Sequence, residues 1–217
     1  EAIVLGNLAG QLLDESIHQL PNTRPYSESV KEFFKGNAIG LLTANVGAQF
    51  HQDAQKQKQN IAQAIHVSLP QKVDQFNLSD GIVEPSFFSE MLGLQGRMDY
   101  LQLDYKVLME QKSGKGGFPY DNFVTPRHTD EHYIQMLLYM ALIRYNYSEA
   151  YERNGKKLYA FLLYSKYTES LHGLGFAPEL IFNAIKVRNG LAWTEMLYTQ
   201  PSGYRILDGL TPEKLNK

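Results

Sequence analysis

The stretch GLQGRMDYLQLDYKVLMEQKSGKG, Gly93–Gly116, contains two short segments that favour β-structure and carry several charged side chains. We predict two antiparallel strands over 97–103 and 106–112, joined by a two-residue turn at Asp104 and Tyr105. Neither turn residue is the glycine or asparagine that tight hairpin turns favour. A four-residue turn gives the same strand pairing, whereas a turn of odd length does not.

The predicted pairing gathers charges of both signs on one face of the hairpin. Leu101 opposes Leu108, and Asp99 therefore opposes Glu110 with about 4.5–5.5 Å between their Cβ atoms. Because side chains alternate between the two faces of a strand, Lys112 shares the face of Glu110. The hairpin is thus expected to bring two carboxylates and one ammonium group into a single cluster.

Two neighbouring carboxylates destabilise each other unless a positive charge lies near both. Lys112 supplies one such charge, and an exposed hairpin held by this ion pair is one interpretation of the pattern. A bound divalent cation is the other, because Mg²⁺ and Mn²⁺ prefer carboxylate, carbonyl and water ligands. The spacing alone leaves both interpretations open.

The segments around the hairpin predict an α/β fold, in which a mixed central β-sheet is flanked by helices. The further elements expected are a helix from Thr43, as its N-cap, to Ile65, a strand over Gly81–Phe88, a helix over 133–143, a strand over 156–167 and a helix over 178–198. The strand over 156–167 is a continuous apolar run, which is typical of a strand buried on both faces. We expect a single domain over 1–200 and a tail over 201–217 that leads to another domain.

Composition excludes several classes of protein. The 217 residues are 43% hydrophobic and 20% charged, with a formal net charge of −2, so any basic surface for nucleic acid must be local. The absence of cysteine excludes disulfides, thiolate zinc sites and an all-cysteine iron–sulfur cluster, and it fits a cytoplasmic location. The apolar runs are shorter than the roughly 20 residues of a membrane span. The chain starts without Met or a basic leader, as expected for a piece of a longer polypeptide.

Three short motifs occur along the chain, the G-x-x-x-H motif first, the D-x(10)-E-x-K motif second and the Q-x-x-x-Y motif last. Asp99, Glu110 and Lys112 form a D-x(10)-E-x-K pattern, QMLLY (Gln135–Tyr139) forms Q-x-x-x-Y, and GAQFH (Gly47–His51) forms G-x-x-x-H. Together they resemble the PD-(D/E)XK nuclease superfamily, and within it the RecB-like branch, which includes nuclease modules of helicase–nucleases. Several members of this branch carry four cysteines that bind an iron–sulfur cluster, and this chain has none.

The resemblance implies a restriction-endonuclease-like core and a set of metal ligands. The implied ligands of one or two Mg²⁺ or Mn²⁺ ions are His51, Asp99, Glu110 and the carbonyl of Gln111. Lys112 would orient or activate the attacking water and stabilise charge on the phosphate. Taken alone, a single helical histidine such as His51 is more often a surface or core residue than a ligand.

The resemblance also assigns supporting residues. It implies that Gln135 contacts the substrate or the lysine and that Tyr139 supports the site, although Tyr139 also fits simple core packing. Glu84 is a further candidate for metal support, and Glu90 competes for the same place in the motif. Lys115 and Arg127, on the loop after the hairpin, are candidate DNA contacts, with solvated loop charge as the alternative. His128 beside them has the same two interpretations.

These expectations combine into a metal-dependent DNA nuclease, specifically an exonuclease that acts on single strands or ends. The resemblance implies a partner helicase domain in the same parent chain or complex, and a role in DNA repair, recombination or replication. A catalytically inactive DNA-binding module that guides a strand to a helicase is one alternative. An α/β scaffold with a chance hairpin motif is another.

Overall fold

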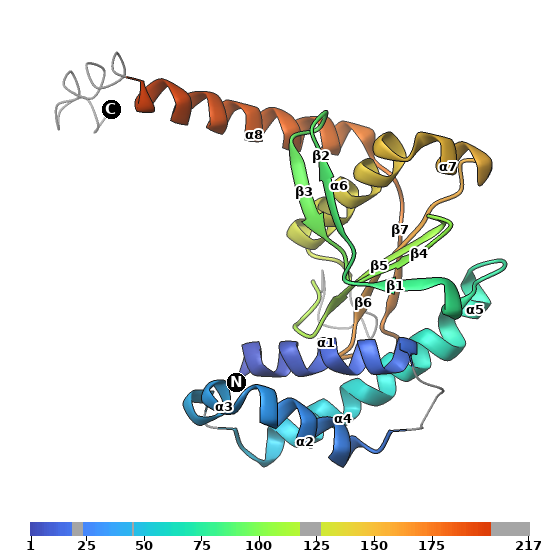
Figure 1. The fold of residues 1–217 in the computed structure, drawn as a ribbon, viewed down its shortest axis with the longest axis vertical. Helices are drawn as coiled ribbons and strands as arrows, with labels where there is room; N and C mark the ends of the chain where they lie inside the picture. The colour runs from blue at the N-terminus through green and yellow to red at the C-terminus, as the bar shows by residue number, and fades with distance from the viewer. Residues whose placement is uncertain (19–23, 45, 118–126, 201–217) are drawn as a thin grey trace. The chain divides into compact units, whose positions relative to one another are not determined.

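The structure is a computed structural model that describes residues 1–18, 24–44, 46–117 and 127–200 (Figure 1). The chain divides into two compact units, one of residues 1–176 and one that begins at Ala177. The predicted tail over 201–217 lies outside the described residues, and the single domain over 1–200 stays a prediction. Among the helices that the structure describes, none has both the length and the apolar character needed to cross a membrane.

The first unit is built on a five-stranded mixed sheet with the strand order β1-β4-β5-β6-β7. These strands are β1 (Gly81–Val83), β4 (Tyr100–Gln102), β5 (Val107–Lys112), β6 (Tyr159–Tyr164) and β7 (Leu171–Leu174). Only β5 and β6 pair in parallel; the other neighbours are antiparallel. The mixed sheet flanked by helices is therefore confirmed, and β6 is buried along nearly its whole length, as its apolar run predicts.

Helices precede the sheet and connect its strands (Figure 1). They are α1 (Ala2–His18), α2 (Tyr26–Gly36), α3 (Ala38–Ala44), α4 (Ala48–Gln63), the π-helix η1 (Ala64–Ser68), α5 (Leu69–Lys72), the 3₁₀-helix η2 (Leu78–Asp80), α6 (Asp130–Asn146), α7 (Ser148–Arg153) and α8 (Pro178–Thr199). The helix predicted over 133–143 is α6, and α8 begins at Pro178 as predicted. The second unit is described through α8.

The predicted N-cap at Thr43 is wrong. Thr43 lies inside α3, where its Oγ1 donates a hydrogen bond back to the carbonyl of Gly40 at 3.0 Å. The hydroxyl therefore bonds to a carbonyl of its own helix, and the next helix has no side-chain cap. That next helix, α4, begins at Ala48 after an extended Gly47.

The core of the first unit lies between α1, α4 and one face of the sheet. Leu8 and Leu12 of α1 pack with Phe50 and Ile61 of α4, and the helices cover a sheet face that includes Met109. Apolar residues at helical spacing form the buried stripe of each helix. Fully burying a side chain such as Leu8 contributes about 1.5–3 kcal/mol. The opposite face of β5 is covered by α6.

The strand predicted over Gly81–Phe88 is two strands, because the chain bends at Glu84 and Pro85. Glu84 has a φ of 50°, in the left-handed region, and Pro85 has no N–H to continue the ladder. The chain from β1 to β4 forms one long hairpin. Its outer strands, β2 (Ser86–Ser89) and β3 (Leu94–Arg97), keep the register in which β1 pairs with β4, but they form a separate two-stranded sheet. This small sheet contacts α6.

The register predicted for β4 and β5 is confirmed, since Leu101 pairs with Leu108. The turn is longer than the two residues predicted, because β4 ends at Gln102 and β5 begins at Val107, and it forms without glycine. Tyr105 takes a φ of 61°, and Asp104 Oδ1 accepts a hydrogen bond from the Lys106 N–H at 2.9 Å. The ring of Tyr105 stacks on Tyr147 with 4.5 Å between centroids.

Candidate active site

Asp99 lies at the bend of the long hairpin, where β4 begins. The bend aims its carboxylate at the end of β5, and Asp99 Oδ2 accepts a hydrogen bond from the Gln111 N–H at 2.6 Å. The Glu84 N–H donates to the Asp99 carbonyl at 3.1 Å, which fixes the backbone of the bend. A break in strand pairing commonly re-aims a side chain in this way.

Glu110, Lys112 and Gln135 form a closed triangle of hydrogen bonds between β5 and α6. Lys112 Nζ lies 2.9 Å from Glu110 Oε1 and 2.9 Å from Gln135 Oε1. Gln135 Nε2 donates to Glu110 Oε1 at 3.0 Å. The triangle fixes the ammonium group of Lys112 in one position, because each of its partners is itself held by the other.

Tyr139 extends this triangle by one residue. Its hydroxyl accepts from Gln135 Nε2 at 2.9 Å and donates to the Arg97 carbonyl at 2.8 Å. The ring lies against Gly96 of β3, where a Cβ would come within 2.5 Å of Tyr139 Cε1. Tyr139 therefore both packs in the core and supports Gln135, so the two sequence interpretations of this residue are compatible.

The two carboxyl groups are held in surroundings that oppose ionisation. Burial raises the pKa of Glu110, whose side chain is almost fully buried, and the neighbouring charge of Asp99 raises it further. Burial also raises the pKa of Asp99, while the Gln111 N–H and Lys112 act in the opposite direction. Glu110 Oε2 has no hydrogen-bond partner among the described residues. The ammonium group of Lys112 therefore lies near two carboxyl groups, and the buried Glu110 Oε2 accepts no hydrogen bond from the described residues.

An open cavity of about 610 Å³ adjoins Asp99. The side chains that reach it from the sheet side include Glu84, Arg97, Asp99, Gln111 and Lys112, and those from α1 include Asn7, Gln11 and Asp14.

Asp14 is a site residue that the motifs do not predict. Its pKa is raised to about 6, first by burial and then by the charge of Glu84, with Asp99 adding to the effect. The helical spacing of Val4, Leu8 and Leu12 is the signal that identifies α1, but it does not reveal which strand the helix faces.

The residues present fit a divalent cation in part. Two raised carboxyl pKa values and the unpartnered Glu110 Oε2 are what a site that requires a positive charge would show. Mg²⁺ is commonly held by one or two carboxylates together with water. Within the described part of the chain there is no group of three His, Cys, Asp or Glu residues placed to hold a metal ion. The ligand role of the Gln111 carbonyl stays a prediction.

His51 lies outside this arrangement, and its role as a metal ligand stays a prediction. It lies on α4, where its Nδ1 is 3.2 Å from the Tyr26 hydroxyl and its ring packs edge-on against Phe50 at 5.5 Å. It also contacts Phe34 and does not line the cavity beside Asp99. The aromatic neighbours explain its position, because α4 turns this face toward α2.

The remaining candidates lie around the cavity. Glu84 is exposed, lines the cavity and forms an ion pair with Arg97 at 3.3 Å, whereas Glu90 lies at the turn between β2 and β3. Lys115 is exposed on the segment after β5. Arg127 is tied to Gly117 by two backbone hydrogen bonds of 2.8 Å, which close the base of the loop. The intervening residues 118–126 lie outside the described structure.

No protein-family model matches the chain, and no curated protein matches it by sequence. Among solved structures, one match is a crystal structure from Eubacterium rectale described as "Putative exonuclease", with 15% sequence identity and a TM-score of 0.44. The match covers 84% of this chain and 63% of that chain, so this chain spans less than two thirds of that neighbour's length. At this level of similarity, the chemistry of the site has to be inferred from its own geometry.

Proposed function

We propose that the chain is a metal-dependent nuclease that hydrolyses phosphodiester bonds of DNA. The observation that carries the proposal is the fixed ammonium group of Lys112, which lies 2.9 Å from a buried glutamate and near a second acid. A salt-bridged surface hairpin does not require Glu110 to be buried with an unpartnered oxygen. In a hydrolytic site, this oxygen would be available to bind a cation.

Residues of β5 would contact the phosphate and the cation, and residues of α6 would orient them. Lys112 would donate to a phosphate oxygen and stabilise the charge that grows on it during hydrolysis. Gln135 orients Lys112, and Tyr139 orients Gln135. Asp99 and Glu110 would hold Mg²⁺ or Mn²⁺, and a bound ion of this kind lowers the pKa of water so that it becomes a nucleophile near neutral pH.

The finer assignments follow from the motif resemblance. They are membership of the RecB-like branch, exonuclease action on single strands or ends, and a helicase partner in DNA repair, recombination or replication. Glu84 lies opposite Asp99 in the hairpin and is proposed to support the cation from the second coordination layer. Lys115 and Arg127 are proposed to contact DNA phosphates.

Cleavage of a fluorescent single-stranded DNA by the purified protein tests the proposal. We expect cleavage with Mg²⁺ or Mn²⁺ and none with EDTA, and we expect Lys112→Ala and Asp99→Asn each to reduce the rate by roughly a hundredfold or more. Lys35→Ala, an exposed lysine on α2, is the matched control and should cleave like the wild type. Equal cleavage by Lys112→Ala and the wild type would refute the assignment.

One observation favours a second function, a non-catalytic DNA-binding module. The described residues do not place a third His, Cys, Asp or Glu side chain with Asp99 and Glu110 in a group that could hold a metal ion. Such a module would bind DNA in the same assay without cutting it under either metal.

A further inference from the structure

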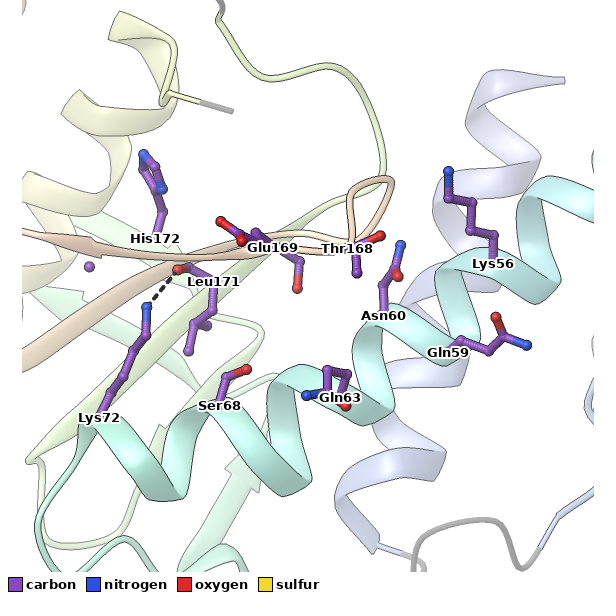
Figure 2. Close-up of a pocket in the computed structure, with 12 residues that line it drawn as sticks. Lys56, Gln59, Asn60, Gln63, Ser68, Lys72, Thr168, Glu169, Leu171 and His172 are labelled. Atoms are coloured by element: carbon purple, nitrogen blue, oxygen red, sulfur yellow. Dashed lines mark hydrogen bonds between the residues drawn. The ribbon is translucent and has the colours of Figure 1, made fainter. Parts of the chain in front are cut away.

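A second cavity, of about 710 Å³, lies between α4, η1 and α5 on one side and the segment before and within β7 on the other (Figure 2). None of its lining residues lines the cavity beside Asp99. Its walls carry amides and hydroxyls, namely Gln59, Asn60, Gln63, Ser68, Thr168 and Ser170. A cavity lined by so many neutral donors suits a ligand rich in oxygen acceptors.

A lysine lies toward each end of this cavity, and a histidine lies near one of them. Figure 2 shows Lys72 and His172 toward one end and Lys56 toward the other. Lys72 Nζ donates a hydrogen bond to the Leu171 carbonyl at 3.2 Å, which holds the lysine across the cavity. Glu169, on the exposed turn before β7, is the carboxylate among the lining residues.

His172 lies in surroundings that oppose its protonation. Burial lowers the pKa of His172, and the charges of His128, Lys72 and Arg127 lower it further, so that His172 favours its uncharged form. His128 lies with its ring centroid 6.3 Å from that of His172 and stacks on Tyr133 at 4.5 Å. His128 Nδ1 is buried and has no hydrogen-bond partner in the described part of the chain.

The frame of the cavity is fixed by buried hydrogen bonds. Asn60 Nδ2 donates to the Ser165 carbonyl at 2.8 Å, and Ser165 Oγ donates to Gln57 Oε1 at 2.7 Å. These bonds join α4 to the turn after β6. On the helix side, the chain passes through the π-helix η1, a rare conformation that often occurs at functional sites. Asn60, which lines the cavity, is therefore held in place before any ligand arrives.

We propose that this cavity binds phosphate groups of a nucleic-acid strand outside the catalytic centre, with Lys72 and Lys56 as its cationic contacts and His172 as an uncharged hydrogen-bonding contact. The choice of nucleic acid as the polyanion rests on the proposed function. A strand also fits the placement of the cations, because one small anion at Lys72 and His172 would leave Lys56 unused. Arg127 is joined by two backbone hydrogen bonds to Gly117, on the segment that follows Lys112.

The test measures binding of a fluorescent oligothymidylate of about 15 nucleotides by anisotropy in EDTA, where cleavage does not interfere. We expect Lys72→Gln and Lys56→Gln each to weaken binding by roughly three- to tenfold and to lower the slope of log affinity against log salt by about one. Gln at position 72 keeps a donor for the Leu171 carbonyl. Glu169→Gln should tighten binding, because it removes a repulsive charge, and Lys35→Gln should leave binding unchanged.

Competition with inorganic phosphate separates a strand from a free anion. Under the proposal, millimolar phosphate displaces the oligonucleotide weakly, and affinity rises with oligonucleotide length. Equal affinity of the wild type, Lys72→Gln and Lys56→Gln for the oligonucleotide would overturn the proposal, as would phosphate binding that matches strand binding. If the protein never cleaves DNA yet the two lysine variants bind it weakly, the nuclease proposal fails and this one stands.

Discussion

Gln135 holds the ammonium group of Lys112 and the carboxylate of Glu110 at the same time. We predict that Gln135→Ala reduces kcat by roughly ten- to a hundredfold, because a small misplacement of a catalytic group costs this much. Tyr139→Phe should have a smaller effect of the same sign, since it removes only the hydroxyl that supports Gln135. Single-turnover cleavage kinetics measure both.

Tyr145→Phe is the control for these variants, because Tyr145 is an exposed tyrosine on the same helix. It should leave kcat unchanged. A Gln135→Ala enzyme with normal kcat and a raised KM would show that Gln135 contacts substrate and does not orient the lysine.

Asp14 predicts a pH dependence of stability. Its pKa is raised from 3.8 to about 6. A carboxyl that holds its proton more tightly in the folded protein stabilises the fold below its ordinary pKa, and this stabilisation is lost as the pH rises through the folded value. We therefore expect Asp14→Asn, which cannot ionise, to raise Tm at about pH 8 and to change it little at about pH 4.

Scanning fluorimetry in EDTA measures this difference without a metal effect. Asp74→Asn, which changes an exposed carboxylate, should shift Tm equally at both pH values. A parallel shift for Asp14→Asn would show that burial of Asp14 has no consequence for its protonation.

For single residues, the sequence predicts contacts that depend on strand geometry alone. The register that pairs Leu101 with Leu108 follows from alternation and turn length, and the approach of Glu110 and Lys112 follows from their spacing on one strand. The position of His51 does not follow, because a helical motif gives no distance to a strand that comes later in the chain. Asp14 was not predicted for the same reason.

The contact between β3 and α6 connects packing to the site. Gly96 leaves room for the ring of Tyr139, and a Cβ there would lie 2.5 Å from Cε1. We predict that Gly96→Ala lowers the free energy of unfolding by about 1–3 kcal/mol, as overpacking does, and lowers kcat by displacing Tyr139 from Gln135. Urea denaturation and cleavage kinetics measure the two effects.

Gly175→Ala is the matched control, because nothing lies within 4 Å of a Cβ at that position. It should be nearly neutral in both measurements. If Gly96→Ala were as stable and active as this control, the small sheet would not support the site.

The elements differ in how far the sequence specifies them. The apolar run of β6 and the periodicity of α6 are strong local signals, and both elements form as predicted. The segment Gly81–Phe88 is extended on both sides of Glu84, but Glu84 itself has a φ of 50° and divides the strand there, and the outer half packs against α6. The edge strand β7, with two glycines among the residues Leu171–Gly175, has a weak signal and was not predicted.

For the whole molecule, a bound cation would add to the stability of the fold. At a hundredfold excess over Kd, a ligand stabilises by about 2.7 kcal/mol, which for a chain of this size raises Tm by roughly 5–10 °C. We predict such a rise with Mn²⁺ for the wild type and none for Glu110→Gln. Scanning fluorimetry with and without Mn²⁺ measures it.

The rise should diminish as the pH falls. Burial raises the pKa of both Asp99 and Glu110, and a cation binds their ionised forms, so protons compete with it at a higher pH than for exposed carboxylates. Glu152→Gln, an exposed acid on α7, should keep the full rise. A rise that persists in Glu110→Gln would place the cation elsewhere.

The bend at Pro85 also affects how copies of this molecule meet in concentrated solution. The outermost strands of the large sheet, β1 and β7, span three and four residues, and β1 stops where the bend turns the chain away. Short outer strands and proline are the means by which natural sheets avoid joining edge to edge and growing into fibrils. The bend that aims an acid at a neighbouring strand therefore also limits self-association.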